Sequence, residues 1–345
     1  MRVAELTAPR QFRLTEAPVP VPGPGEVLAQ VHSVGVCGSD LHYYADGAVG
    51  NIPCVYPQVI GHEPVGVIVK TGAGVTGWQP GDRAALEPAV YCYHCEFCLA
   101  GRHNLCRRLR FMSMPPDPGF LRQFVSLPAH NLLALPNELD FHTATLFEPL
   151  AVVLNSMRFI ALRTGETAAV FGAGPIGLLT IALLKLAGAA RVWAVEPVAA
   201  RRELALRMGA DAALDPQAVD PAHQILADTG QRGVDAAIDC AAKGDTINQC
   251  LAVARSAGRV VITGIPVGVQ VALDYHVMRY KELAFHPVRR SNHDSELALR
   301  LLREHPARFA PLLTHCAPLD RIASAFEMLE HYRDGVGKLV IDIPD

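Results

Sequence analysis

Four cysteines lie close together in one short stretch, with the spacing Cys92-x2-Cys95-x2-Cys98-x7-Cys106. Zinc takes four tetrahedral ligands, and short spacers between cysteines let one loop of chain close around the ion. Because sulfur would fill all four positions, we expect a structural zinc site in a lobe at residues 90–108. Free buried thiols are one alternative. A zinc module that binds nucleic acid is another, because basic residues surround the last cysteine: Arg102, His103, Arg107, Arg108 and Arg110.

A second set of candidate metal ligands is spread more widely along the chain: Cys37, His62, Glu63 and Glu148. A thiolate, an imidazole and a carboxylate all suit zinc, and three protein ligands leave a fourth position open for a substrate. These residues could therefore form a catalytic zinc site. The spacing alone leaves the alternative that they pack in the core, as single cysteines and histidines more often do.

An apolar run at residues 168–171 leads into a glycine-rich turn and then into a helical stretch. The glycines allow a tight turn and close approach of the backbone to a pyrophosphate, which the helix N-terminus would stabilise. This arrangement is typical of a dinucleotide site, although a glycine-rich turn without a ligand is the alternative. The residues concerned are Gly172, Gly174, Pro175, Ile176 and Gly177.

An acidic residue follows the glycine turn at the distance expected for a contact with ribose. Glu196 ends the next predicted strand, nineteen residues beyond Gly177, where a carboxylate can hold both hydroxyls of an adenosine ribose. Because the same carboxylate would repel a 2′-phosphate, NAD is favoured over NADP. Arg201, a candidate cofactor contact, and Arg202 could soften this preference, or both could lie on an exposed helix face.

The elements that must position these groups change in character along the chain. Up to about residue 140, β-branched runs such as 27–36 and 65–69 alternate with Pro/Gly turns, which indicates β structure. From about residue 167, apolar strands alternate with helical stretches, which indicates a parallel sheet covered on both faces. The predicted strands of this part are 168–172, 191–196, 212–215, 234–240 and 258–265. Helices at 295–304 and 320–331 and a strand at 338–343 follow.

Length and composition set the frame for these sites. The chain has 345 residues, which at about 150 residues per domain predicts two domains. A net charge of -3 gives no strong attraction to nucleic acid or to acidic membranes. Nine cysteines, an odd number, and an N-terminus without an apolar signal segment favour a reducing cytoplasm. We expect Cys54, Cys240, Cys250 and Cys316 to be small buried apolar residues.

One uncharged stretch, residues 167–184, reaches the lower limit for a membrane span. Its glycines and its proline divide it into a short β-type run and a helical run. We therefore expect two buried elements of a sheet-containing domain and no membrane partner.

Taken together, these segments resemble the zinc-dependent medium-chain dehydrogenases over essentially the whole chain, and within them the polyol dehydrogenases of the sorbitol dehydrogenase type. The resemblance implies an α/β protein with a GroES-like β-barrel catalytic domain, a Rossmann dinucleotide-binding domain with a doubly wound parallel sheet, and an active site in the cleft between them. We expect the catalytic domain at 1–150 and 288–345 and the Rossmann domain at 151–287. A homotetramer, or at least a homodimer, is also implied. The stretches that carry the resemblance are 34–44, 59–72, 81–88, 115–125, 147–152, 172–179 and the four-cysteine lobe.

The resemblance also implies roles for individual residues. Cys37 and His62 match ligands of the catalytic zinc, and Glu63 matches the acid that follows the ligand histidine. Glu148 occupies the position of a cysteine ligand in typical alcohol dehydrogenases. In the sorbitol type this glutamate binds zinc or holds the zinc-bound water, so the choice of Glu63 or Glu148 as third ligand stays open.

Further matches concern proton transfer and the substrate. Ser39 and His42 match a proton relay, although they could also merely cap a turn. Tyr43 matches a tyrosine of the substrate pocket, and Arg289 matches an arginine that meets polyol hydroxyls. Arg290 departs from the sorbitol type, in which tyrosine is usual at this position.

The expected reaction is the reversible oxidation of a secondary alcohol of a polyol or sugar alcohol to a ketose, by hydride transfer to NAD. Two zinc ions per subunit are expected, one catalytic and one structural. Threonine, butanediol or simple secondary-alcohol dehydrogenation would use the same zinc chemistry and is the first alternative. A non-catalytic structural or cofactor-binding member of the family is a more distant one.

Overall fold

The computed structural model describes residues 1–266, 268 and 270–344 of the chain. The chain divides into two compact units, each of which draws on separate segments of the sequence. The first unit comprises Met1–Pro149, Asn292–Pro306 and Leu313–Asp345. The second comprises Leu150–Ser291 and Ala307–Leu312.

The first unit is built on a seven-stranded sheet with the order β11-β7-β6-β3-β19-β18, in which β10 also pairs with β3. The strand pairs are antiparallel except for β18 and β19. The strands are β3 (Glu26–Gly35), β6 (Glu63–Thr71), β7 (Arg83–Leu86), β10 (Phe124–Pro128), β11 (Leu132–Ala134), β18 (Leu313–Pro318) and β19 (Lys338–Asp342). Two-stranded sheets are formed by β1 (Arg2–Ala8) with β2 (Gln11–Glu16), β4 (Ala48–Val49) with β5 (Ile52–Pro53), and β8 (Ala89–Val90) with β9 (Arg110–Phe111).

Short helices complete the first unit: α1 (Gly38–Ala45), α2 (Glu96–Leu99), α3 (Phe141–Ala144), α10 (Ser295–Glu304) and α12 (Ile322–Glu330). Helix α12 shows how the core forms, because its buried residues recur at helical spacing: Ile322, Ala325, Phe326 and Leu329. This apolar stripe belongs to the same core cluster as the buried side chains of β3. The end of strand β3, where the chain continues from Gly35 to α1, is therefore anchored in the hydrophobic core.

The second unit contains a six-stranded sheet with the order β14-β13-β12-β15-β16-β17, and all its strand pairs are parallel. In chain order the sequence of strands is 3-2-1-4-5-6, which is the arrangement of the doubly wound dinucleotide-binding fold. The strands are β12 (Thr167–Phe171), β13 (Arg191–Val195), β14 (Ala212–Leu214), β15 (Val234–Asp239), β16 (Ala254–Ile262) and β17 (Ala284–Pro287). The fold-class prediction is confirmed.

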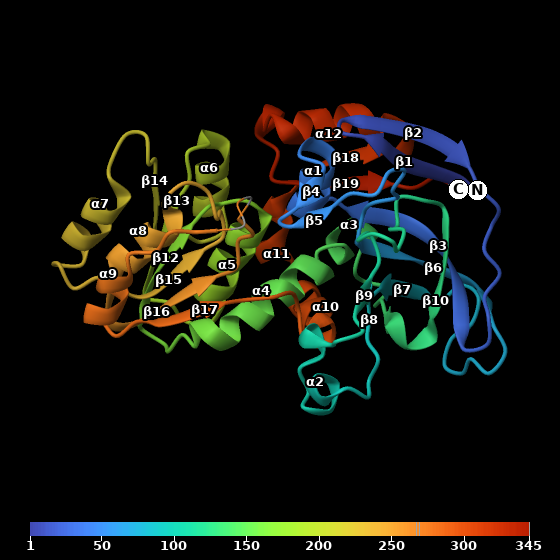
Figure 1. Ribbon diagram of the computed structural model, residues 1–345, viewed down its shortest axis with the longest axis horizontal. Helices are drawn as coiled ribbons and strands as arrows, with labels where there is room; N and C mark the ends of the chain where they lie inside the picture. Colours follow the sequence, from blue (N-terminus) through green and yellow to red (C-terminus); the bar gives the residue numbers. More distant parts are fainter. Residues whose placement is uncertain (267, 269, 345) are drawn as a thin grey trace. The chain divides into compact units, whose positions relative to one another are not determined.

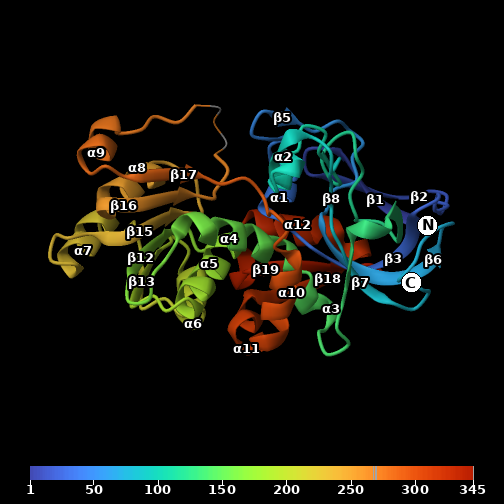
Figure 2. The same ribbon diagram turned by 90° about the horizontal axis from the view of Figure 1, so that it is seen from below.

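Helices cover both faces of this sheet, as the alternating pattern of the sequence predicts. In two perpendicular views α7, α8 and α9 lie on one side of the strands, and α5 and α6 lie on the other (Figure 1, Figure 2). The helices are α4 (Phe147–Ile160), α5 (Pro175–Leu186), α6 (Ala199–Arg207), α7 (Pro221–Asp228), α8 (Thr246–Val253), α9 (Tyr275–Tyr280) and α11 (Pro306–Phe309). The strand order reverses direction at β12, so the crevice at its carboxyl end is where ligands bind in such sheets.

The uncharged stretch at 167–184 falls into two buried elements, the strand β12 and most of the helix α5. Among the residues that the structure describes, no helix has the length and the apolar character needed to cross a membrane.

Candidate metal centres and dinucleotide site

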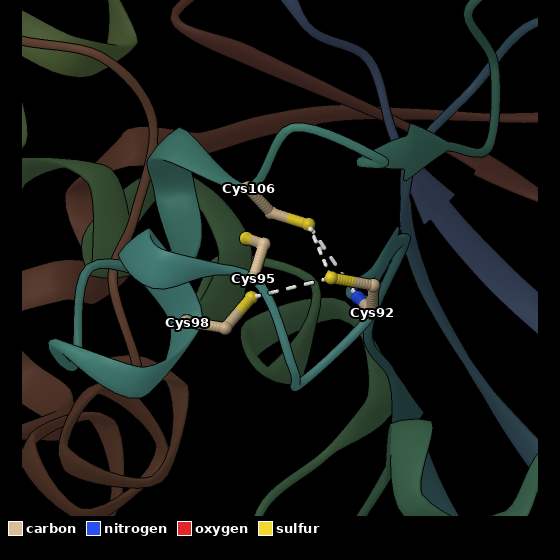
Figure 3. Close-up of side chains that lie close together, drawn as sticks. All are labelled: Cys92, Cys95, Cys98 and Cys106. Atoms are coloured by element: carbon tan, nitrogen blue, oxygen red, sulfur yellow. Dashed lines mark hydrogen bonds between the residues drawn. The ribbon is translucent and has the colours of Figure 1, made fainter.

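The four cysteines of the lobe converge on one point (Figure 3). Their four sulfur atoms all lie within 4.8 Å of one another. Cys95 precedes α2 and Cys98 lies within it, so one helical turn presents two of the thiols. Backbone N–H groups of Cys92 and Arg108 each lie 3.4 Å from Cys106 Sγ, which favours an anionic sulfur. Backbone hydrogen bonds from Cys98 and Arg107 lower the pKa of Cys95 to about 6. This is a closed set of four sulfur ligands, which fits a structural zinc.

Basic residues of the lobe are occupied by neighbours. Arg107 forms an ion pair with Glu96, and Arg110 forms one with Asp117. Arg108 Nη1 lies 3.1 Å from His94 Nε2. Three of the basic side chains thus have partners within the lobe or next to it, and this weakens the alternative of a module that binds nucleic acid.

The second ligand group forms where two strands of the first unit meet. Cys37 is the N-cap of α1 and follows β3, whereas His62 directly precedes β6. The antiparallel register pairs Gly35 of β3 with Glu63 of β6, which brings these distant segments together. The ligand atoms of Cys37, His62 and Glu63 lie within 4.8 Å of one another, and both His62 and Glu63 are buried. The arrangement offers one thiolate, one imidazole and one carboxylate to a metal.

Glu148 lies outside this group of three, although it is a close electrostatic neighbour. It is buried in the first turn of α4. Burial raises the pKa of Glu148 to about 8; His62 opposes this effect, and the carboxylates of Glu63 and Glu87 add to it. A divalent cation would relieve the crowding of these acids. The geometry therefore favours Glu63 over Glu148 as the carboxylate ligand.

Asp40 is a further buried residue of this site that the sequence analysis missed. Its buried carboxylate accepts hydrogen bonds from the backbone N–H of Cys37 at 3.1 Å and of Gly61 at 3.0 Å, and from Ser113 Oγ at 3.1 Å. One oxygen lies 3.3 Å from His62 Nδ1, which leaves Nε2 as the nitrogen for a metal. Burial alone would lower the pKa of His62, but Asp40 and Cys37 raise it well above its usual value.

Two more charged groups escaped the sequence analysis. Lys338, at the start of β19, forms an ion pair with Glu63. Glu87 follows β7 and accepts a hydrogen bond of 2.6 Å from Ser295 Oγ, and burial raises its pKa. Glu87 lies within stretch 81–88, one of those that carry the resemblance, which is the signal that could have marked it.

The predicted relay residues lie on α1. Ser39 and His42 are three residues apart, so they share a face of the helix. His42 Nδ1 lies 2.8 Å from Asp46 Oδ2, which leaves Nε2 for proton transfer. At the start of α1 the capping box is formed by Cys37 and Asp40, whereas His42 contacts Asp46, the C-cap residue of the helix. Tyr43 packs within the core cluster of the unit.

The glycine turn of the second unit lies between β12 and α5. Gly172 has φ +93, and a Cβ there would lie 2.8 Å from Ala241 Cβ. A Cβ on Gly177 would collide with Gly172 O. Gly174 is the N-cap of α5, and Pro175 and Ile176 open the helix. Gly172 is therefore needed for its backbone conformation, and Gly177 for the close packing of the helix against the turn.

Glu196 follows β13 and reaches back to the glycine turn. Its carboxylate accepts hydrogen bonds from the backbone N–H of Ala173 at 2.8 Å and of Val198 at 3.0 Å. Arg201 lies near the turn as well, because a Cβ on Gly174 would be 4.0 Å from its Nη1. This brings the predicted acid and the predicted arginine together beside the helix N-terminus.

The alternative of an exposed helix face is wrong for both arginines. Arg201 is only 9% exposed. Arg202 forms an ion pair with Asp215 at 2.9 Å and donates to the carbonyl oxygens of Glu196 and Pro197. Arg201 is therefore a buried polar residue beside the glycine turn.

Arg289 and Arg290 follow the last strand of the parallel sheet, at its carboxyl end. Arg290 has φ 54, and Asn155 Nδ2 donates to its carbonyl oxygen at 2.7 Å. The backbone of this predicted substrate segment is therefore held by a buried side chain of α4.

The remaining cysteines differ in environment. Cys250 is buried and Cys54 and Cys240 are partly buried. Cys316 is exposed, so the prediction of a buried apolar residue is wrong there. The reason is its place on β18, which is the last strand of the sheet order and has no partner strand beyond it in that order.

Comparison with known proteins agrees with this description. The family model "Alcohol dehydrogenase GroES-like domain" matches residues 23–137, and the model "Zinc-binding dehydrogenase" matches residues 175–304. Sorbitol dehydrogenase of Homo sapiens is 34% identical, with 95% of this chain and 92% of the relative covered. A probable D-xylulose reductase A of Neosartorya fischeri is 33% identical, with 97% and 95% covered.

Solved structures give the same picture. 2R,3R-butanediol dehydrogenase from Bacillus subtilis has a TM-score of 0.89 at 29% identity, covering 100% of this chain and 99% of its own. An Escherichia coli alcohol dehydrogenase complexed with NADH has a TM-score of 0.90 at 27% identity, with 99% of each chain covered. A putative zinc-binding dehydrogenase from Sinorhizobium meliloti, bound to NADP, has a TM-score of 0.89 at 30% identity, with 99% and 98% covered.

A GroES-like unit with gathered metal ligands and a Rossmann unit with a glycine turn define the class of zinc-dependent dehydrogenases. The chain belongs to the zinc-dependent medium-chain dehydrogenase/reductase superfamily and resembles its polyol dehydrogenases. The predictions of the family and of an enzyme are confirmed.

Proposed function

We propose that the protein oxidises a secondary alcohol of a polyol or sugar alcohol to a ketose, reversibly, by hydride transfer to NAD. The observation that carries the proposal is the group of Cys37, His62 and Glu63, whose ligand atoms lie within 4.8 Å of one another. One thiolate, one imidazole and one carboxylate suit a zinc that keeps a position open for substrate. The four cysteines of the lobe would hold a second, structural zinc, giving two ions per subunit.

The two units take the expected parts of this reaction. The first unit would be the catalytic domain and the second the dinucleotide-binding domain. These units follow the domains that the resemblance implies, at 1–150 with 288–345 and at 151–287, except that residues 150, 288–291 and 307–312 lie in the second unit. The glycine turn, Glu196 and Arg201 form its cofactor site. Glu196 would repel a 2′-phosphate, so NAD is the cofactor, and NADP tolerance would depend on Arg201. One similar structure is complexed with NADH and another is bound to NADP, so both cofactors should be tested.

When bound, the zinc supplies Lewis-acid chemistry that lowers the pKa of the alcohol hydroxyl. Ser39 accepts the hydroxyl proton, which passes on to His42. Asp46 holds Nδ1 of His42, so Nε2 is the nitrogen that receives the proton. The protein thus orients the alcohol, removes its proton and holds the nicotinamide that takes the hydride.

Further residues orient this machinery. Asp40 would fix the ring of His62, as carboxylates do behind ligand histidines, and Glu148 would either serve as the alternative carboxylate ligand or hold a water near the metal. Tyr43 and Arg289 would contact the polyol hydroxyls. Oxidation of threonine, butanediol or a simple secondary alcohol is the alternative, and the similarity to butanediol dehydrogenase supports it. Arg290, in place of the usual tyrosine, leaves the particular substrate open.

Assembly and location remain parts of the proposal. We expect a homotetramer or homodimer in the cytoplasm, as the family resemblance implies. Sedimentation of the purified protein at two concentrations measures the assembly. A monomer at both concentrations would contradict it.

A substrate screen tests the proposed reaction. NADH formation is measured with C4–C6 alditols, 2,3-diols, threonine and simple secondary alcohols, and the zinc content per subunit is determined on the same sample. We expect NADH formation with at least one alditol. Activity confined to diols, threonine or simple alcohols would replace the substrate class. A zinc-loaded protein that oxidises none of these would overturn the proposal.

A further inference from the structure

Lys338 is a lysine buried beside the proposed catalytic metal site. Its side chain is 1% exposed, and fully buried lysines are rare unless they are paired. Its ammonium forms an ion pair with Glu63 Oε2 and donates a hydrogen bond to the carbonyl oxygen of Val36 at 2.9 Å. Val36 directly precedes Cys37, so one lysine contacts the backbone next to one ligand and the side chain of another.

The sheet is built to bring this pair together. Strand β19 pairs with β3 at Val340 and Gly35, and β3 pairs with β6 at Gly35 and Glu63. A Cβ on Gly35 would collide with Glu63 Oε2 and would lie 3.1 Å from Lys338 Cε. The glycine at the centre of the three strands therefore makes the room that the ion pair occupies.

The two oxygens of Glu63 have different surroundings. Oε2 faces the ammonium of Lys338. Both oxygens are buried and neither has a hydrogen-bond partner among the described residues, so the ion pair of Oε2 with Lys338 is what distinguishes them. The carboxylate belongs to the ligand group with Cys37 and His62. A buried, unpaired carboxylate oxygen is costly, so Oε1 is suited to receive a metal ion.

We propose that Lys338 is a positioning residue for the catalytic metal: by holding Oε2 of Glu63, it presents Oε1 as a single-oxygen ligand. This inference rests on the proposed function, because it takes the site at Cys37 as the catalytic one. The ammonium also offsets one negative charge in a place where Glu63 and Glu148 are close. Both effects keep the fourth metal position open for an alcohol.

Substitution of Lys338 distinguishes a role in positioning Glu63 from a role in filling the core. Without Lys338, Glu63 can turn both oxygens to the zinc, and the site carries one more negative charge. Zinc should then be held more tightly while the open position is lost. If the lysine only fills the core, its removal should loosen the strands and release zinc faster.

The experiment compares Lys338→Met with Lys281→Met. Lys281 is a matched control, because it is partly buried in the second unit and donates to the carbonyl oxygens of Leu251, Ala252 and Ala254. Zinc release from the purified holoenzyme to an excess of a colorimetric chelator is followed in time. Zinc should leave in two kinetic phases, one from each site. The phase that belongs to the catalytic site is identified as the one that is absent in Cys37→Ser.

We expect Lys338→Met to slow the catalytic phase about tenfold, equivalent to about 1.4 kcal/mol, because a second oxygen ligand and one uncompensated negative charge would hold the ion more tightly. The release phase of the four-cysteine lobe should stay unchanged, as should both phases in Lys281→Met. Cobalt substituted at the catalytic site should give weaker visible absorption in Lys338→Met, because a further oxygen ligand raises the coordination number. Unchanged or faster release, with an unchanged cobalt spectrum, would overturn the proposal.

A second variant covers the case in which Lys338→Met does not fold. The double variant Lys338→Met/Glu63→Gln removes both charges of the pair, so it should fold without zinc and show a higher thermal midpoint than zinc-free Lys338→Met. Failure of the double variant to fold would assign the lysine to packing. These measurements use no alcohol and no NAD, so their outcome is independent of the substrate screen.

Discussion

Asp40 is the residue on which the geometry of the proposed zinc ligands most depends. It accepts a hydrogen bond from the backbone of Cys37 and faces Nδ1 of His62. A carboxylate in this position fixes the ring and raises the basicity of the nitrogen that binds the metal. The side chain touches no substrate, yet two ligands are oriented through it.

The variant Asp40→Asn keeps the size of this side chain and removes its charge. We expect zinc affinity at the catalytic site to fall about 10–100-fold, because the ring of His62 loses its orienting partner. Competition with a metallochromic chelator measures the affinity. The control is Asp46→Asn, at the end of the same helix, which should leave zinc affinity unchanged. Equal losses in the two variants would speak against an orienting role.

Some residues of the site could be predicted from the sequence and others could not, and the difference has a physical reason. The cysteines of the lobe are near neighbours in the chain, so their spacing alone predicts a shared metal. Asp40 instead meets Gly61 and Ser113, which are 21 and 73 residues away. Lys338 meets Val36 across 302 residues. No local pattern reports contacts that depend on the pairing of remote strands.

Among the structural elements, the turn between β12 and α5 gives the sharpest test of the dinucleotide site. A Cβ at Gly177 would collide with Gly172 O, whereas a Cβ at Gly174 would have its nearest neighbour at 4.0 Å. We expect Gly177→Ala to raise the Kd for NADH by more than about tenfold, or about 1.4 kcal/mol, because the helix is pushed away from the turn. Fluorescence titration with NADH measures this.

Gly174→Ala is the matched variant in the same turn. It should keep the thermal midpoint of the parent protein, whereas Gly177→Ala should lower it, because only the Cβ at position 177 collides with the protein itself; at position 174 an added methyl would oppose only a bound pyrophosphate. If Gly174→Ala lowers the thermal midpoint more than Gly177→Ala does, the close approach at Gly177 is not what the turn requires.

A charged network ties the amino ends of three parallel strands together. Asp235, in β15, accepts hydrogen bonds from Arg232 at 2.6 Å and from Arg255 at 2.7 Å, and from the backbone of Thr167 in β12 at 2.9 Å. Burial alone would raise the pKa of Asp235, but these hydrogen bonds lower it well below its usual range. A carboxylate with a depressed pKa stabilises the fold above its unfolded pKa of about 3.9 and loses this effect in acid.

We expect Asp235→Asn to lower the free energy of unfolding at pH 7 by about 2 kcal/mol, typical of hydrogen bonds to a charged group. The difference from the parent protein should shrink as the pH falls below about 4, because the unfolded parent then binds a proton at Asp235 that the folded parent, with its lowered pKa, does not. Urea unfolding of both proteins over a pH series measures this. A difference that is constant with pH would show that the charge of Asp235 has no part in it.

For the whole molecule, the alternation of apolar strands and helices was enough to predict a parallel sheet covered on both faces. The antiparallel sheet of the first unit is harder to foresee, because β19 at the end of the chain inserts between β3 and β18. Cys316 illustrates the difficulty, since its exposure follows from the place of β18 at the end of the sheet order. Local patterns predict elements, whereas their neighbours depend on long-range pairing.

The two proposed zinc sites give the molecule separate tasks that one substitution can distinguish. Cys37 belongs to the open site, whereas the lobe at residues 90–108 closes its own site with four sulfurs. Loss of the Cys37 thiol should leave the lobe and the glycine turn unaffected, because they lie in other segments of the chain.

The most direct test is the zinc content and turnover of Cys37→Ser beside the parent protein, on a substrate found in the screen. We expect two zinc ions per subunit in the parent and one in the variant, with turnover abolished and NADH binding retained. A variant that keeps both zinc ions, or that turns over substrate without the second one, would contradict the assignment of a catalytic zinc to this site.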